Sequence, residues 1–308
     1  TTFNRDYESL STDDRLPLFN RATDGVYAPG STFKLCTAVA ALESGIITPT
    51  TTIRDQGVYT YYAYPQPKCW IYRQYGSTHG SINVSQAITE SCNYFFYETG
   101  RLTGIETIDN YATQFGLGRS TGIETGDSKG ALASPEYAKA NELEWTDGQT
   151  ITAAIGQSYN LFTPIQLANY VATLVGDGEH YKAHLLKNVK SYDNSSMIYA
   201  YDEGPENTVS ISDSTLQAVK EGMYGVANST LSSQFSRCIV TCGAKTGSAQ
   251  VGTDIANGTF VCFAPYDDPQ IAVAVVIEKG GSGAALAGVA VDIVNAYFSR
   301  EEIGTAII

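Results

Sequence analysis

The chain has few basic residues, very few histidines and no long hydrophobic run. Its 19 lysines and arginines are outnumbered by 32 aspartates and glutamates, which gives a net charge of −13. An acidic surface of this kind argues against binding to nucleic acid or to an anionic membrane. The longest uninterrupted apolar run covers residues 271–277, and it is far shorter than the roughly 20 residues that cross a bilayer.

The chain also lacks the cysteine and histidine spacings that are typical of metal sites. It has three histidines, and its six cysteines are Cys36, Cys69, Cys92, Cys238, Cys242 and Cys262. No two of them form a C-x-x-C pair, so we expect neither a structural zinc site nor any other cofactor. The sequence leaves their pairing open. We expect most of them to be buried apolar thiols, with Cys242 and Cys262 as candidate neighbours because they flank a predicted hairpin.

Residues 27–45 are the stretch around which the rest of the chain is organised. Their sequence is YAPGSTFKLCTAVAALESG, in which a Pro-Gly turn precedes a run of helix formers and Gly45 marks the helix end. Apolar residues occur on every face of this predicted helix, so we expect it to be buried. Only Ser31 and Lys34 interrupt the apolar pattern at its start, and their spacing puts them on one face.

This spacing suits nucleophilic catalysis. A serine hydroxyl becomes an effective nucleophile when a base lies within hydrogen-bond reach, and Lys34 is the candidate base for Ser31. A free lysine has a pKa near 10.4, and lowering it to about 7–8 costs about 4 kcal/mol, which burial and a second cation could supply. The unpaired N–H groups of the first helical turn would suit a developing oxyanion. In isolation, however, S-x-x-K is more typical of an ordinary helix start with a solvent-exposed lysine.

Ser91-Cys92-Asn93 is a second motif, of the form S-x-N. It follows one predicted helix and precedes another, whereas the copies at residues 81–83 and 158–160 lack that context. A serine and an amide presented from a turn between buried helices could reach into a cleft. The simpler interpretation is that they cap the next helix.

Lys245-Thr246-Gly247-Ser248 is the third motif, and K-[ST]-G occurs nowhere else in the chain. Glycine within a predicted strand indicates close approach by another group. A cationic side chain, two hydroxyls and a strand edge could bind an extended peptide by strand addition and by capture of its terminal carboxylate. A bulged hairpin strand with a solvated lysine is the alternative for this motif alone.

The remaining pattern predicts an α+β fold. Helical periodicity predicts helices at 83–100 with a turn inside, and at 105–116, 163–175, 213–227 and 284–298. Strand-like runs that begin near residues 238, 258 and 270 predict an antiparallel meander, and 16–19 predicts a further short strand. We expect residues 119–150 to be loop-rich and residues 185–211 to be an excursion with short strands.

Together the three motifs form the ordered set of the penicilloyl serine transferases. The flanking sequences resemble those of the class B penicillin-binding proteins, bacterial cell-wall transpeptidases: NRATDGVYAPGSTFK, HGSINVSQAITESCNYFFYETG, GQSYNLFTPIQLA and GAKTGSAQ. The resemblance extends from about Asn20 to Phe298, and Cys69-Trp70 resembles the elongation-type members. It implies that residues 1–308 are a D,D-transpeptidase catalytic domain.

The resemblance implies a role for each catalytic residue that matches the family's motifs. Ser31 would be the acylated nucleophile and Lys34 its base. Ser91 would relay the proton to the leaving amine. Lys245 would supply positive charge, which also helps to keep the other lysine neutral.

The resemblance also implies how the substrate is bound. Asn93 would bind the substrate's amide, and the hydroxyls of Thr246 and Ser248, on either side of Gly247, would bind its carboxylate. The backbone N–H groups of Ser31 and Ser248 would form the oxyanion hole, since two donors are needed around one oxygen.

The family's fold implies a five-stranded antiparallel sheet flanked by helices, plus a mostly helical subdomain. On this chain the sheet subdomain would comprise about residues 1–45 and 231–308, and the helical one about 46–230. The resemblance implies a place at the extracytoplasmic face of the bacterial cell membrane. Thr1 does not begin a signal peptide, and we expect the family's N-terminal anchor helix and pedestal domain to be missing from this sequence.

The implied substrates are peptidoglycan stem peptides that end in D-Ala-D-Ala, and β-lactams would be covalent inhibitors. A membrane glycosyltransferase would be the partner of the full-length protein.

Several alternatives remain open. A β-lactamase often carries a deacylating glutamate in an E-x-x-L-N stretch, and EYAKANELEW at 136–145 lacks that spacing. A D,D-carboxypeptidase would use the same residues with water as the acceptor. A β-lactam sensor would use the acylated serine as a binding switch and would need a signalling domain. A cysteine hydrolase that uses Cys36 or Cys92 is less favoured, because no histidine lies in a motif.

Overall fold

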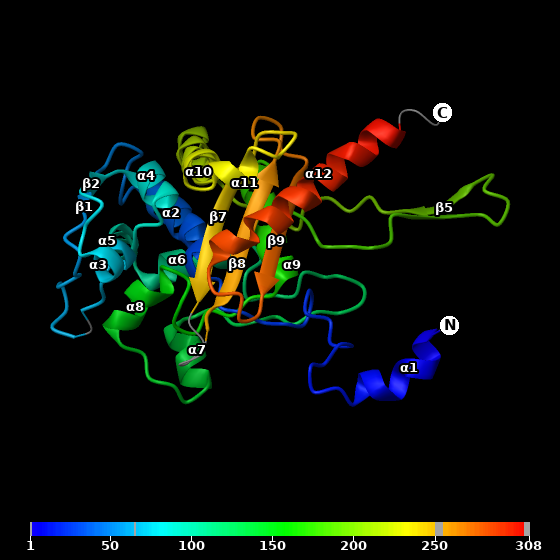
Figure 1. Ribbon diagram of the computed structural model, residues 1–308, viewed down its shortest axis with the longest axis horizontal. Coiled ribbons are helices and arrows are strands. Elements are labelled where there is room, and N and C mark those ends of the chain that lie inside the picture. Colours follow the sequence, from blue (N-terminus) through cyan, green and yellow to red (C-terminus); the bar gives the residue numbers. More distant parts are fainter. Residues whose placement is uncertain (1, 65, 250–254, 305–308) are drawn as a thin grey trace.

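The computed structural model describes residues 2–64, 66–249 and 255–304. At its centre lies an antiparallel sheet of β7 (Gly243–Ala249), β8 (Asn257–Ala264) and β9 (Ile271–Ile277), in the order β7-β8-β9 (Figure 1). In its register Lys245 lies opposite Val261. The predicted C-terminal meander is therefore confirmed.

Helices surround this sheet and form most of the remaining body (Figure 1). In chain order they are α1 (Thr2–Ser11), η1 (Gly30–Phe33), α2 (Lys34–Glu43), α3 (Trp70–Tyr75), α4 (Val84–Thr89), α5 (Asn93–Thr103), α6 (Ile105–Gln114), α7 (Pro135–Ala140), α8 (Asp147–Ala153), α9 (Pro164–Val175), α10 (Asp213–Gly225), η2 (Val226–Thr230), α11 (Ser232–Phe235), η3 (Gly283–Leu286) and α12 (Ala287–Gly304). Among the described residues, no helix combines the length and hydrophobicity needed to cross a bilayer.

Alternation of side chains along the strands gives the sheet two buried faces. Phe260 and Cys262 of β8 lie in one apolar cluster with residues of η3 and α12. Val261 and Phe263 alternate with them and lie in a second, larger cluster with residues of α2, α5, α9 and α10. The α+β class with helices on both faces of the sheet is thus confirmed, and α2 is central to the larger cluster.

Two expectations about local structure are wrong. We expected five strands in the main sheet, and the described sheet has three. Residues 16–19 form turns and no strand, and they follow the helix α1. The segment 119–150 is loop-rich, as expected, and its helices are α7, which Ser134 caps with Pro135 in the first turn, and the start of α8. The proposed division into two subdomains remains a prediction.

The expected excursion at 185–211 is present. Short strands outside the main sheet pair as β1 (Ile53–Arg54) with β2 (Ser81–Ile82), β3 (Glu179–His180) with β6 (Asn207–Thr208), and β4 (Asn188–Lys190) with β5 (Met197–Ala200). The β4–β5 hairpin extends away from the body of the molecule (Figure 1).

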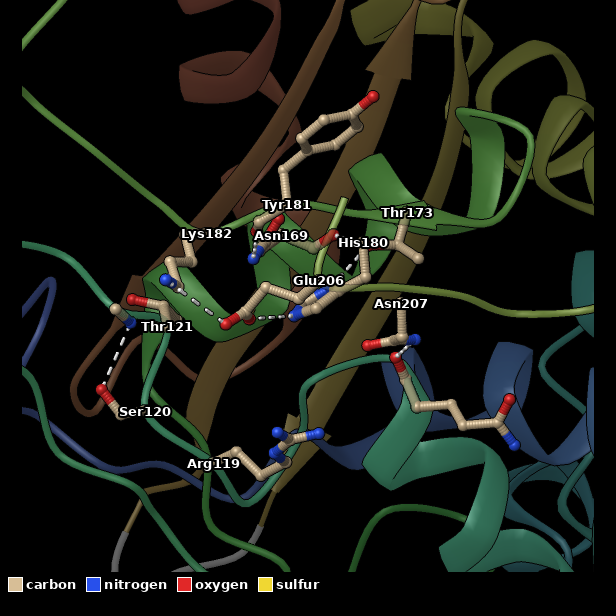
Figure 2. Close-up of polar contacts among 12 residues, drawn as sticks. Arg119, Ser120, Thr121, Asn169, Thr173, His180, Tyr181, Lys182, Glu206 and Asn207 are labelled. Atoms are coloured by element: carbon tan, nitrogen blue, oxygen red, sulfur yellow. Dashed lines mark hydrogen bonds and ion pairs between the residues drawn. The ribbon is translucent and has the colours of Figure 1, made fainter. Parts of the chain in front are cut away.

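At the base of this excursion, His180 joins the β3–β6 pair to α9. Its Nδ1 lies 3.0 Å from the Thr173 hydroxyl, and its Nε2 lies 3.9 Å from a carboxylate oxygen of Glu206. Glu206 lies between His180 and Lys182 (Figure 2). Burial lowers the pKa of His180 below its ordinary value, so the ring is neutral near neutral pH.

Candidate active site

Ser31 lies in η1, a short 3₁₀ segment that leads directly into α2. Side chains three residues apart eclipse one another in a 3₁₀ turn, so Ser31 and Lys34 lie on the same side. Every residue from Lys34 to Leu42 is buried, as the apolar pattern predicted, whereas Ser31 is partly exposed. The candidate nucleophile is therefore accessible at the end of a buried helix.

Ser91 and Asn93 lie at the turn between α4 and α5. Ser91 has a left-handed backbone conformation with a φ of 52°, which a residue other than glycine adopts only where surrounding contacts compensate. Cys92 accepts a hydrogen bond from the N–H of Phe95 and so caps α5. The structure places this copy of S-x-N between two helices, as the sequence predicted.

Two lysine amines converge on Ser91. Lys245, from β7, donates a hydrogen bond to Ser91 Oγ over 2.9 Å. Lys34 Nζ lies 3.4 Å from the same Oγ, 2.8 Å from the Ser91 carbonyl oxygen and 2.6 Å from Asn93 Oδ1. The three sequence motifs therefore meet at one hydroxyl.

Both amines are fully buried, and burial disfavours their charged forms. Burial lowers the pKa of Lys34 to about 8. Burial, together with the nearby Lys34, holds the pKa of Lys245 well below its ordinary value. Within the described part of the chain, neither lysine forms an ion pair with a carboxylate. Both amines therefore lose their protons more easily than an exposed lysine does.

Two glycines let η1 and β7 lie backbone to backbone. Gly30 has a φ of +53°, and a Cβ built there would lie 2.9 Å from the Ser248 carbonyl oxygen and 3.1 Å from the Ser248 nitrogen. A Cβ on Gly247 would lie 2.5 Å from the Pro29 carbonyl oxygen. This close approach brings the backbone around Ser31 next to that of Ser248, the two positions expected to form the oxyanion hole.

The hydroxyls of the third motif lie on the other face of β7. Residues alternate along a strand, so Thr246 and Ser248 point away from the face that carries Lys245. Ser248 is exposed, and its Oγ accepts a hydrogen bond from the N–H of Gly283 over 3.1 Å. Because β7 is the outer strand of the described sheet, an extended peptide could add along its edge.

Ser31 and Lys34 share a side of the helix, but no hydrogen bond joins their side chains in the described structure. The Lys34 amine contacts Ser91 and Asn93 instead. The S-x-N copy at residues 158–160 is structural, because its serine donates to Gln149 and its asparagine donates to Ala153.

A second polar cluster lies beside the S-x-N turn, and the sequence did not predict it. Asp55, Cys69, His79 and Cys92 each offer one ligand atom, and these four atoms lie within 4.8 Å of one another. His79 Nδ1 lies 2.8 Å from Asp55 Oδ2 and 3.6 Å from Cys69 Sγ. Hydrogen bonding from Cys92 lowers the pKa of Cys69 to about 5.

Two thiols, an imidazole and a carboxylate are donors that suit a tetrahedral zinc ion. In the described part of the chain, His79 Nε2 is buried without a hydrogen-bond partner. His79 is also one of the residues that line a cavity of about 460 Å³. Our expectation that a zinc site is absent was based on the missing C-x-x-C pair. These donors come from separate loops, and only the fold brings them together.

This donor cluster shares Cys92 with the S-x-N motif. Cys92 Sγ lies 3.7 Å from Asp55 Oδ2 and 3.9 Å from Cys69 Sγ. Contacts that hold Cys92 in the donor cluster therefore also restrict the positions of its neighbours Ser91 and Asn93. These two residues contact the buried lysines.

Comparison with known proteins gives matches over nearly the whole chain. The sequence profile described as penicillin binding protein transpeptidase domain matches residues 2–298. Peptidoglycan D,D-transpeptidase MrdA of Escherichia coli (strain K12) is 34% identical over 304 residues, which cover 92% of this chain and 47% of MrdA. The chain thus spans about half the length of the curated relatives that it matches.

Solved structures match the fold as well. The crystal structure of Pseudomonas aeruginosa PBP2 in complex with WCK 5153 matches with a TM-score of 0.84 at 30% identity, over 95% of this chain and 66% of that one. The imipenem acyl-enzyme complex of penicillin-binding protein A from M. tuberculosis matches with a TM-score of 0.82 at 25% identity, over 96% and 65%. With the family profile covering almost all of its residues, this chain belongs to the penicillin-binding protein transpeptidase domain family.

Proposed function

We propose that this chain is the catalytic domain of a peptidoglycan D,D-transpeptidase that works through a serine acyl-enzyme. The observation that carries the proposal is the contact of Lys34 and Lys245 with one hydroxyl, that of Ser91, beside the turn that holds Ser31. The similarity to MrdA, itself named a peptidoglycan D,D-transpeptidase, supports this reaction.

Lys34 is the proposed general base. A neutral amine has two N–H groups and one lone pair. Its two short contacts, to the Ser91 carbonyl oxygen and Asn93 Oδ1, use both N–H groups as donors and leave the lone pair for a hydroxyl. The lowered pKa of Lys34, about 8, makes this neutral form accessible near neutral pH.

In the proposed acylation, Ser31 Oγ attacks the carbonyl carbon of the penultimate D-Ala and gives its proton to Lys34. Lys34 passes this proton to Ser91 Oγ, and Ser91, which accepts a hydrogen bond from Lys245, gives its own hydroxyl proton to the departing amine. The C–N bond breaks, D-Ala leaves, and an ester on Ser31 remains. The amine of a second stem peptide then attacks this ester, which forms the cross-link and restores the serine hydroxyl.

Substrate binding is proposed along β7. The edge of β7 would pair with the stem peptide, and the hydroxyls of Thr246 and Ser248 would bind its terminal carboxylate. The backbone N–H groups of Ser31 and Ser248 would stabilise the oxyanion, which the close approach at Gly247 supports. Asn93 would contact the substrate amide.

The cellular setting is part of the same proposal. We place the domain at the extracytoplasmic face of the bacterial cell membrane, where its peptidoglycan substrate lies. We infer an elongation-type role with a membrane glycosyltransferase as partner, and the similarity to a solved peptidoglycan synthase complex, described as coordinating polymerization and crosslinking, supports such a partner.

Acylation is tested by the intact mass of the protein after treatment with benzylpenicillin. The unaltered chain should gain the mass of one penicilloyl group, and the Ser31→Ala variant should gain none. Ser81→Ala changes an exposed serine of another S-x-N copy and should be labelled normally. Full labelling of Ser31→Ala would reject this serine as the nucleophile.

A second experiment separates a transpeptidase from its alternatives. The protein is supplied with a stem pentapeptide, with and without an acceptor amine, and both D-Ala and cross-linked product are measured. A transpeptidase forms cross-linked product when the amine is present. Release of D-Ala without any cross-link would indicate a carboxypeptidase, and rapid turnover of nitrocefin would indicate a β-lactamase.

A further inference from the structure

Cys238 and Cys242 form a close thiol pair outside the active site. Their sulfur atoms lie 3.4 Å apart, and both thiols are free. Cys242 directly precedes β7 and is buried, whereas Cys238 is only partly buried. Cys262, the candidate neighbour of Cys242, lies in the same apolar cluster, and Ala244 is the residue directly opposite it in the sheet.

Hydrogen bonds to the backbone hold the loop that carries the two cysteines. The side chain of Asn295, on α12, accepts a hydrogen bond from the N–H of Ile239 and donates one to the carbonyl oxygen of Arg237. The N–H of Tyr266 donates to the carbonyl oxygen of Thr241. These bonds fix the loop between the two cysteines to α12 and to the segment after β8, so the proximity of the sulfurs follows from the backbone.

We propose that Cys238 and Cys242 are a redox site that forms a reversible disulfide across the loop leading into β7. Cys238 is the accessible thiol that reacts first, and Cys242 is the buried thiol that resolves the intermediate. Hydrogen bonds from the Cys242 thiol and from backbone N–H groups lower the pKa of Cys238 to about 6, which favours its thiolate. Closing the bond requires the two sulfur atoms to approach from 3.4 Å to about 2.05 Å.

The oxidant is an external disulfide, either a low-molecular-weight one or that of a thiol oxidoreductase. The Cys238 thiolate attacks one sulfur of this disulfide, forms a mixed disulfide and releases one thiolate. Cys242 then loses its proton to that thiolate and attacks the Cys238 sulfur, which releases the second thiol. The two cysteines lose two electrons and two protons in total, and the external disulfide is reduced to two thiols.

The consequence concerns the strand that carries the third motif. Lys245 follows Cys242 by three residues, and a disulfide at this point would tie the start of β7 to the loop bound to α12. The bond lies outside the residues proposed for acyl transfer. It would therefore stabilise the strand without entering the reaction, and its formation does not depend on the proposed function.

The test is oxidation of the folded, full chain in glutathione buffers of increasing redox potential. Samples are quenched with acid, free thiols are alkylated, and the digested protein is mapped by mass spectrometry. We expect the loss of two hydrogen atoms and one cross-linked peptide pair that contains Cys238 and Cys242. The Cys242→Ser variant should stop at a glutathionyl adduct on Cys238, and Cys238→Ser should form neither adduct nor cross-link. The Cys262→Ala variant is the matched control and should cross-link normally.

Two results would overturn the proposal. One is that both thiols remain free in the most oxidising buffer, with the Cys242→Ser variant also unmodified at Cys238. The other is a cross-link that joins Cys242 to Cys262. Penicillin labelling of the oxidised protein is measured in parallel and is expected to match that of the reduced protein. This readout keeps failure of the redox pair distinct from failure of the proposed acyl transfer.

Discussion

Lys34→Arg is the substitution that tests the proposed chemistry most directly. Arginine keeps the positive charge and most of the side-chain length, but its guanidinium does not lose its proton in a protein. If a neutral amine at this position is the base, the variant should be unable to activate Ser31. Lys34→Ala removes both the base and the charge, and it serves as the companion variant.

The magnitude follows from the lowered pKa of Lys34. Burial takes it from 10.5 to about 8, a difference in free energy of about 3 kcal/mol between the two protonation states. With a pKa of about 8, roughly a tenth of the molecules have a neutral Lys34 at about pH 7 and half at about pH 8. The acylation rate constant of the unaltered protein should therefore rise about fivefold between these two values and level off above about pH 9.

The assay is stopped-flow acylation by a fluorescent penicillin over this pH range. Loss of a general base typically costs about 10²–10⁴-fold, so both variants should be slower by that factor, and the alkaline rise should disappear. Lys139→Arg alters an exposed lysine on α7 and should keep the rate and the pH profile of the unaltered protein.

Two results would refute this reasoning. A Lys34→Arg variant that is acylated at a near-normal rate would show that no neutral amine is needed at this position. A rise with the same midpoint in the Lys34→Ala variant would assign the titration to another group, and Lys245 would then be the first to examine.

Four further predictions concern other parts of the molecule. A Cβ on Gly283 would lie 2.3 Å from a backbone oxygen of β7, so Gly283→Ala should lower both the melting temperature and the acylation rate; unchanged values would show that η3 can move away at no cost. The pKa of His180 is lowered in the folded chain, so the unfolded chain takes up a proton first as the pH falls. The free energy of unfolding should therefore decrease below about pH 6.5. Urea titrations at several pH values measure this decrease, and the His180→Asn variant should show a smaller one. Zinc should bind at one ion per chain and raise the melting temperature, and His79→Ala should abolish both effects; equal zinc uptake by the variant would exclude the donor cluster. A disulfide between Cys238 and Cys242 should raise the free energy of unfolding by about 2 kcal/mol, measured by urea titration of the oxidised and reduced protein, and an equal or lower value would show that closure strains the loop.

The features that could be predicted from the sequence are those with a short-range cause. The helix after Ser31 was predicted from its continuous apolar run and its glycine stop, and it is buried from Lys34 to Leu42. The capping box at Thr163 and Gln166, with a proline in the first turn, predicted the start of α9. Alternation between short turns likewise predicted the three strands of the C-terminal meander.

What could not be predicted depends on contacts between distant segments. The donor cluster joins Asp55, Cys69, His79 and Cys92 from separate loops, and no spacing rule describes such a set. The sequence left the pairing of Cys242 open and offered Cys262 only as a candidate neighbour across a predicted hairpin. The structure places its sulfur 3.4 Å from that of Cys238, in a loop that is hydrogen-bonded to α12.

In the candidate site, too, local spacing could be predicted from the sequence and contacts between distant segments could not. The spacing of Ser31 and Lys34 predicted a shared side, which the 3₁₀ turn provides. It did not predict that the amine would contact Ser91 and Asn93, because that requires the S-x-N turn to pack against the start of α2. A motif therefore indicates which residues are candidates for the site, whereas the packing of helices decides which atoms their side chains contact.

The lowered pKa values of Lys34 and Lys245 show most clearly that packing determines properties that the sequence alone does not reveal. Two amines that are buried without a carboxylate partner in the described structure are unfavourable for folding, since each loses hydration and neither gains a counter-ion. A carboxylate placed between them would remove that cost, but it would also keep Lys34 protonated and unable to act as a base. The stability lost at this point is thus a requirement of the proposed chemistry. A sequence can show where two lysines are, but only the fold shows that, among the described residues, neither of them forms an ion pair with a carboxylate.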